Sequence, residues 1–197
     1  MITRRSLYSV DGRGFTLIEI LVVISIIALT TSLVLASLQT ARKKAIASAV
    51  TSQVRQYLLA IELYRDTTGK YPSEVTFGTN GSCLGSGYPN GRCGWYDSDS
   101  AAVENPAFNA ALAPYISLAR FNFGKITWGS DPFWEWRGAY YFCLPISGVC
   151  NQASVTWWVP GNESCRIPGA YIFMGDNMTG CQYVLEGSVN PDIVNPQ

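Results

Sequence analysis

A glycine, a phenylalanine and a glutamate near the start of the chain have the types and spacing for proteolysis followed by ion pairing. Gly14 precedes Phe15, and Glu19 follows four residues later. Cleavage between Gly14 and Phe15 would create a positive amine about 6 Å along a helix axis from the Glu19 carboxylate. Glycine before the cut lets a protease approach the backbone closely. In an assembly of parallel helices, the amine of one subunit could neutralise Glu19 of its neighbour and so set their register.

These residues open an apolar run that is long enough to cross a membrane. Residues 15–38 carry one ionisable side chain, Glu19, and basic residues flank the run on both sides. A helix of this length extends about 36 Å, more than a hydrocarbon core of about 30 Å. A secretory signal peptide has a shorter apolar region and a small-residue cleavage site after it, so this run is predicted to be retained. Because a charge on a membrane helix costs on the order of 3 kcal/mol at the bilayer centre, and less near the interface, Glu19 is expected to have a function and a partner.

The segment Gly14-Phe15-Thr16-Leu17-Ile18-Glu19, behind a short basic leader, resembles the class III signal of type IV pilins and type II secretion pseudopilins. The resemblance implies that a prepilin peptidase removes residues 1–14 and N-methylates Phe15, and that Glu19 guides assembly into a helical homo-oligomeric filament. It also implies an assembly platform and an ATPase as partners, a single-pass inner-membrane precursor, and an extracellular or periplasmic filament. One departure is Ala36, where many members have a proline that kinks the helix.

Beyond residue 38 the apolar pattern becomes one-sided, which predicts an amphipathic second half of the same helix. No proline occurs between residues 15 and 71, and Gly69 followed by Pro72 would end the helix. We therefore predict one helix from about Phe15 to Thr67, with residues 15–38 in the membrane, residues 39–68 amphipathic, and residues 69–197 forming a disulfide-bonded globular head. The segment from Ile61 to Ser73, which includes Tyr71-Pro72, resembles the helix exit of major pseudopilins and of many short pilins. The apolar stripe consists of Ile46, Val50, Val54, Leu58 and Ile61.

The rest of the chain predicts a small antiparallel sheet, and therefore an α+β fold in which the long helix packs on the sheet, as in pilins. Residues 76–100 are predicted to form a loop, Asn105-Pro106 a helix start, and residues 175–180 a hairpin turn. Strands are expected at residues 125–128, 139–144, 154–159, 170–174 and 182–185.

Six cysteines lie between residues 83 and 181, without a Cys-x-x-Cys pair and without any histidine to complete a zinc site. An even number behind a membrane-targeting segment indicates disulfides formed in an oxidising compartment. Six cysteines allow 15 pairings. Pairing between neighbours is favoured because each pair closes a short loop, and a pair linking the long loop to the sheet is the alternative. The neighbouring pairs are Cys83 with Cys93, Cys143 with Cys150, and Cys165 with Cys181.

Composition disfavours an enzyme, a cofactor site and a nucleic-acid-binding protein. The absence of histidine removes the commonest general base. From residue 67 onward, ten acidic side chains outnumber six basic ones, a poor surface for phosphate backbones. Some relatives bind calcium, but no loop here has an EF-hand-like ligand series, so no metal is expected. The weak calcium candidates are Asp97, Asp99, Asp131, Asp176 and Glu186.

Two other functions remain as alternatives to a surface pilus subunit. The helix exit favours a pseudopilin of a secretion system, whereas the disulfide-bonded head favours a surface-exposed filament. A membrane-anchored adhesin or glycan-binding module is the second alternative, because Trp134-Glu135-Trp136 would place two tryptophans on one face of a strand. Packing in a small head, or contact between subunits, is the other use expected of the tryptophans.

Overall fold

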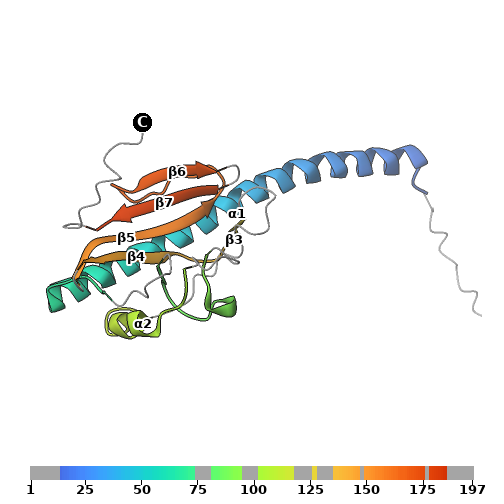
Figure 1. Cartoon of the computed structure of the whole chain (residues 1–197). Coiled ribbons are helices and arrows are strands. Elements are labelled where there is room, and N and C mark those ends of the chain that lie inside the picture. The colour runs from blue at the N-terminus through green and yellow to red at the C-terminus, as the bar shows by residue number, and fades with distance from the viewer. Residues whose placement is uncertain are drawn as a thin grey trace, which may run out of the picture. The chain divides into compact units, whose positions relative to one another are not determined.

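The computed structural model describes residues 14–73, 81–94, 102–117, 126–127, 135–146, 149–175 and 178–185. The chain divides into two compact units, Met1–Ala41 and Arg42–Gln197. Helix α1, Leu17–Thr68, begins in the first unit and ends in the second (Figure 1). The helix ends at Gly69, whose φ of +76° suits glycine and whose N–H donates to the Arg65 carbonyl at 2.7 Å. The single helix predicted from the sequence is confirmed to within two residues at each end.

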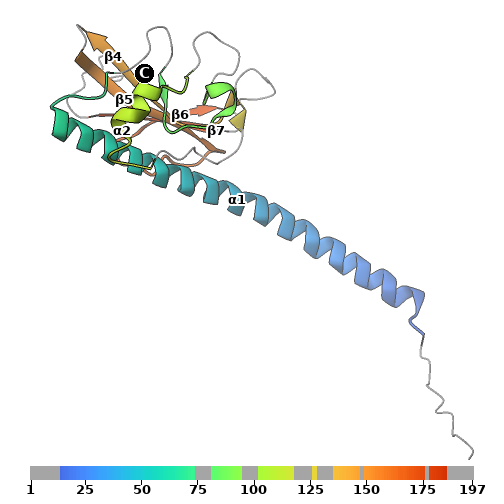
Figure 2. The same cartoon turned by 90° about the horizontal axis from the view of Figure 1, so that it is seen from below.

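A five-stranded antiparallel sheet forms the centre of the second unit, with the strand order β1-β4-β5-β7-β6. Figures 1 and 2 show its strands beside the C-terminal part of α1, which confirms the α+β arrangement. A separate pair, β2 and β3, is also antiparallel. The strands are β1 Ser82–Cys83, β2 Ile126–Thr127, β3 Glu135–Trp136, β4 Tyr140–Ile146, β5 Val149–Pro160, β6 Tyr171–Gly175 and β7 Met178–Val184.

Two sequence-based expectations for the sheet were wrong in detail. Ser82–Cys83 lies in the predicted loop, yet it forms β1 because it pairs with Tyr140 and Tyr141 of β4. The turn before β7 is shorter than predicted, since Gly175 already pairs with Met178. Such pairings depend on distant or neighbouring strands and have little local signal.

The core lies between α1 and the sheet. Helix residues on the predicted stripe or beside it are buried there, with Ile46 and Leu58 only partly so. Trp157 is fully buried on the sheet side, while Trp158 packs with Met178 and Phe173 in a second cluster. The packing role is confirmed for these two tryptophans, whereas Trp134 lies outside the described residues. Full burial stabilises each large apolar side chain by about 1.5–3 kcal/mol. The α1 residues in the core are Ala47, Val50, Val54, Tyr57 and Ile61.

Helix α2, Pro106–Leu112, begins where Asn105-Pro106 predicted. The Asn105 side-chain oxygen accepts hydrogen bonds from the backbone N–H groups of Ala107 and Phe108, at 3.0 and 3.2 Å. The Phe108 ring stacks on Tyr141 with centroids 5.0 Å apart, so α2 joins the core through β4. The 3₁₀ turn η1, Pro89–Gly91, precedes it in the chain.

Three disulfides tie the head together: Cys83–Cys93, Cys143–Cys150 and Cys165–Cys181, each with an S–S distance of 2.03 Å. These are the nearest-neighbour pairs that the sequence favoured, and no cysteine is free. The Cys165–Cys181 bond joins the loop after β5 to β7. The loop lies beside α1, where the hydroxyl of Thr51 donates to the Ala47 carbonyl at 2.8 Å and also lies 3.4 Å from the Cys165 carbonyl.

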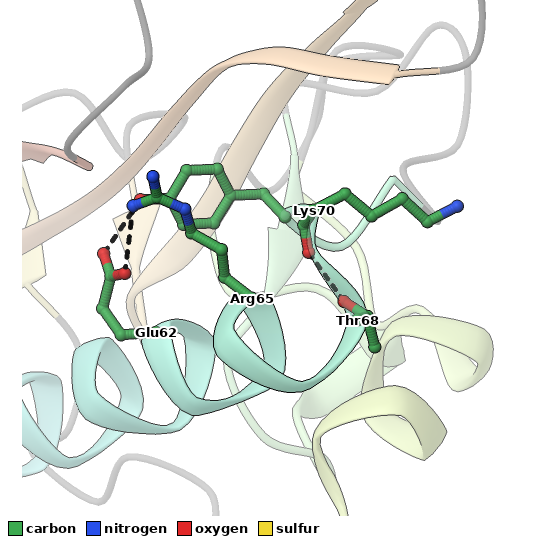
Figure 3. A network of polar contacts seen from close by, with 5 residues as sticks. Glu62, Arg65, Thr68 and Lys70 are labelled. Carbon is green, nitrogen blue, oxygen red and sulfur yellow. Dashed lines mark hydrogen bonds and ion pairs between the residues drawn. The ribbon is translucent and has the colours of Figure 1, made fainter.

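Tyr71, just beyond the end of α1, forms hydrogen bonds with Glu62 and Arg65 of the last turns of the helix, both labelled in Figure 3. The Tyr71 hydroxyl donates to Glu62 Oε1 at 2.9 Å and accepts from Arg65 Nη1 at 2.8 Å. The Arg65 guanidinium also lies 4.8 Å from the centre of the Tyr71 ring. Burial, and then the hydrogen bond to the Glu62 carboxylate, raise the pKa of Tyr71 above its ordinary value. The hydroxyl therefore stays protonated and keeps both hydrogen bonds at neutral pH.

Replacing Tyr71 with phenylalanine should destabilise the head modestly. The variant keeps the buried ring but loses both hydrogen bonds, and a cost of about 1 kcal/mol is expected because Glu62 and Arg65 are more than a third exposed. Urea unfolding of the detergent-solubilised full chain would measure it. Lys70→Ala is the control, since the Lys70 side chain points away from this network in Figure 3. Equal stability of Tyr71→Phe and the unaltered chain would contradict the prediction.

Candidate functional site

The three residues singled out for processing and pairing lie together at the start of α1. Gly14, Phe15 and Thr16 form an exposed segment just before the first helical residue, Leu17. A Cβ built on Gly14 would meet no atom within 4 Å. This chain's own described packing therefore does not require glycine at residue 14. A need for glycine here would come from something that approaches the backbone from outside.

The Glu19 carboxylate accepts hydrogen bonds from Thr16, the residue just before the first helical residue. Glu19 Oε2 accepts from both the backbone N–H and the hydroxyl of Thr16, each at 2.8 Å. In return, the Glu19 N–H donates to the Thr16 hydroxyl at 3.3 Å. This is a capping box, in which the N-cap threonine and the glutamate three residues later satisfy helix N–H groups that otherwise have no partner. It fixes Glu19 beside the first turn of α1.

Thr16 was missed as a functional residue by the sequence analysis. The signal that could have found it is the spacing of threonine and glutamate, Thr-x-x-Glu before an apolar run. Because Thr16 directly follows Phe15, the Glu19 carboxylate points toward the part of the chain that a cut after Gly14 would convert into a new N-terminus. Within the described residues, Glu19 has hydrogen bonds to Thr16 and no cationic partner.

Four hydroxyl side chains of the apolar run donate hydrogen bonds to carbonyls of their own helix. Ser25 donates to the Leu21 carbonyl at 2.8 Å, and Thr31 donates to the Ile27 carbonyl at 2.7 Å. Thr30 and Ser32 make similar bonds to carbonyls three or four residues earlier. Such bonds let hydroxyls enter an apolar environment at little cost. Glu19 is the one ionisable side chain of the run, and its negative charge has no opposite charge beside it among the described residues.

The apolar side chains of the run are exposed. Phe15 is 83% exposed and Leu33 is 68% exposed. Among the described residues, α1 is the one helix long and apolar enough to cross a membrane, and none of its most apolar window is buried. Lipid or other apolar helices can cover such a surface, because exposure of so much apolar area to water is unfavourable. This helix is consistent with a membrane-anchored precursor.

The calcium candidates cannot be placed. Asp97, Asp99, Asp131, Asp176 and Glu186 all lie outside the described residues. Within the described part of the chain, no three His, Cys, Asp or Glu side chains come together in a way that could hold a metal ion.

Comparison with known proteins identifies one segment. Residues 12–35 match the family model of the prokaryotic N-terminal methylation motif, the class III signal shared by type IV pilins and pseudopilins. The match includes Gly14, Phe15, Thr16 and Glu19. No curated protein and no solved structure matches the chain.

Proposed function

We propose that this chain, which carries the N-terminal methylation motif of type IV pilins and pseudopilins, is a structural subunit of a type IV filament. The motif supports a pilin-like or pseudopilin subunit in general. The single observation that carries the finer proposal is the arrangement of Gly14, Phe15 and Glu19 at the start of an exposed apolar helix. In this proposal the head is a structural unit displayed by the filament, and the chain has no catalytic site.

Processing prepares the N-terminus for assembly. A prepilin peptidase hydrolyses the Gly14–Phe15 bond, which releases residues 1–14 and leaves a positive amine on Phe15, and then methylates that amine. A methylated amine still carries a proton and its positive charge at neutral pH. The exposed backbone before α1 and the open space around Gly14 support access by such an enzyme.

The capping box lets the precursor hold its carboxylate in the membrane before a partner is present. A buried carboxylate without hydrogen bonds would be costly, and Thr16 supplies two of them. After the cut, the amine of one subunit neutralises Glu19 of a neighbour as their apolar helices pack side by side. Removing both charges from lipid together favours the assembled state over the separated one. An assembly platform and an ATPase, the partners that the motif's family uses, would supply the work of extraction.

Replacing Gly14 with valine should leave the uncut precursor in the membrane. A Cβ at residue 14 meets no described atom within 4 Å and the segment is exposed, so folding should be unaffected while the peptidase is blocked. Mass spectrometry of the purified chain would find residues 1–14 still attached, whereas the unaltered chain would begin at a methylated Phe15. Gly12→Ala is the control for a change within the leader, and it should be cut normally. An unaltered chain that retains residues 1–14 would overturn the proposed function.

A surface pilus is proposed over a secretion pseudopilus because three disulfides stabilise the head. Disulfides persist in oxidising surroundings and suit a small domain displayed outside the cell. Electron microscopy of cells at native expression, with an antibody against the head, would distinguish the two. If the cell surface carries no filaments, and protein secretion by the cells depends on this chain, the pseudopilus would be favoured.

A further inference from the structure

A groove on the outer side of α1 is not used by the processing and assembly motif. Its volume is about 490 Å³, and it lies between the helix and the loop that follows β5. We call it the Arg55 groove. Six of the seven lining residues have polar side chains, two of them arginines, and none is acidic: Ser48, Thr51, Ser52, Arg55, Gln56, Leu59 and Arg166.

The loop wall of the groove is held in a costly conformation. Arg166 has a φ of +56°, which a residue with a side chain rarely adopts. The Arg55 guanidinium donates to the Arg166 carbonyl, and the Thr51 hydroxyl lies 3.4 Å from the adjacent Cys165 carbonyl. The Cys165–Cys181 bond anchors the same loop to β7. A backbone conformation of this kind costs about 1–3 kcal/mol and persists where the surroundings fix it, often at a binding site.

The two arginines have binding capacity left for an anion. A guanidinium carries five N–H donors. Within the described residues, Arg55 donates one N–H to the Arg166 carbonyl. The Arg166 guanidinium forms an ion pair with Glu163 at 3.5 Å, and the Arg166 side chain is 38% exposed. The hydroxyls of Ser48 and Ser52 line the groove beside them. Two arginines and two serines that line one groove provide donors for a carboxylate, which a guanidinium can bind in a bidentate manner.

We propose that the Arg55 groove receives an acidic side chain from a second copy of this chain. Opposite charges on two parts of the sequence support this occupant. The segment 41–66 has five basic and two acidic residues, whereas the chain from residue 67 has ten acidic and six basic ones. Leu59, 62% exposed, lines the groove together with Arg55, and arginine is enriched at protein interfaces. The inference rests on the proposed function, because a filament supplies the neighbouring copies.

Photo-crosslinking in cells tests the groove directly. The full chain would carry p-benzoylphenylalanine in place of Gln56, which lines the groove and is exposed, or in place of Ala110, an exposed residue of α2 that does not line it. Irradiation of sheared filaments should crosslink residue 56 to another copy, and mass spectrometry should place the crosslink in a peptide that contains Asp or Glu. Crosslinks only to other proteins, or only to peptides without acidic residues, would overturn the proposal.

Charge variants complete the test. Arg55→Glu and, separately, Arg166→Ala should lower the yield of the residue-56 crosslink about tenfold or more. Arg166→Ala keeps the carbonyl that Arg55 binds, so it removes the guanidinium without removing that contact. Lys44→Glu changes charge on the same helix outside the groove lining and should leave the yield unchanged. An equal loss of crosslink yield in Lys44→Glu would overturn the proposal for the groove but leave the proposed filament function intact. Chains that keep residues 1–14 and form no filaments would overturn both the groove proposal and the filament function.

Discussion

Cells that produce the Glu19→Ala variant are expected to contain normal amounts of membrane-inserted chain, cut after Gly14, and no filaments. Removing the carboxylate makes insertion easier, since it removes a charge that costs up to about 3 kcal/mol at the bilayer centre and less near the interface, where Glu19 lies. Assembly fails because the Phe15 amine of a neighbour then has no opposite charge to meet within lipid. Electron microscopy would count the filaments, and blotting of membrane fractions would measure the chain.

Two further variants separate the charge of Glu19 from its capping of the helix. Glu19→Gln keeps a side-chain oxygen that can accept from Thr16, so the capping box survives while the charge is lost. It should fail to assemble as Glu19→Ala does. Ser25→Ala is the control, because the Ser25 hydroxyl bonds only within its own helix. Normal filaments from Glu19→Gln would show that capping, and not charge pairing, is the task of this residue.

Removing the Cys165–Cys181 bond should destabilise the head more than removing Cys143–Cys150. The first closes a span of 16 residues and the second a span of 7. Loop entropy predicts a loss of about 3 kcal/mol for the longer span and about 2 kcal/mol for the shorter. Paired Cys→Ser substitutions in the full chain, unfolded with urea in detergent, would measure both losses. An equal loss from the two pairs, or a larger one from Cys143–Cys150, would contradict the loop-length argument.

The features that sequence predicted well are those set by neighbours along the chain. Helix α1 follows from a continuous apolar run and then a one-sided pattern, and its end follows from Gly69. Asn105 caps α2 because its side chain reaches N–H groups two and three residues later. The site at Gly14, Phe15 and Glu19 is also local, which is why its spacing alone was enough to propose a chemistry.

Features that depend on distant segments could not be predicted. The Arg55 groove joins residues 55 and 166, which are 111 positions apart. The start of β7 was missed because Gly180 interrupts the strand pattern. In the structure Phe173, its partner on β6, covers that glycine, and a Cβ on Gly180 would lie 1.8 Å from the Phe173 ring. Packing from the neighbouring strand thus supplies the side chain that the glycine lacks.

The placement of the disulfides has a mechanical consequence for a filament under tension. All three bonds lie within residues 83–181, and α1 contains no cysteine. Along its length, α1 is therefore joined to the sheet by noncovalent contacts, which include the side chains of Val50, Val54 and Ile61, and the covalent link is the backbone that leaves the helix at Gly69. Within the head, the closed loops limit how far the chain can be drawn out before a covalent bond bears the force. The contact between helix and sheet should yield first, by shear, while the disulfide-closed loops remain short.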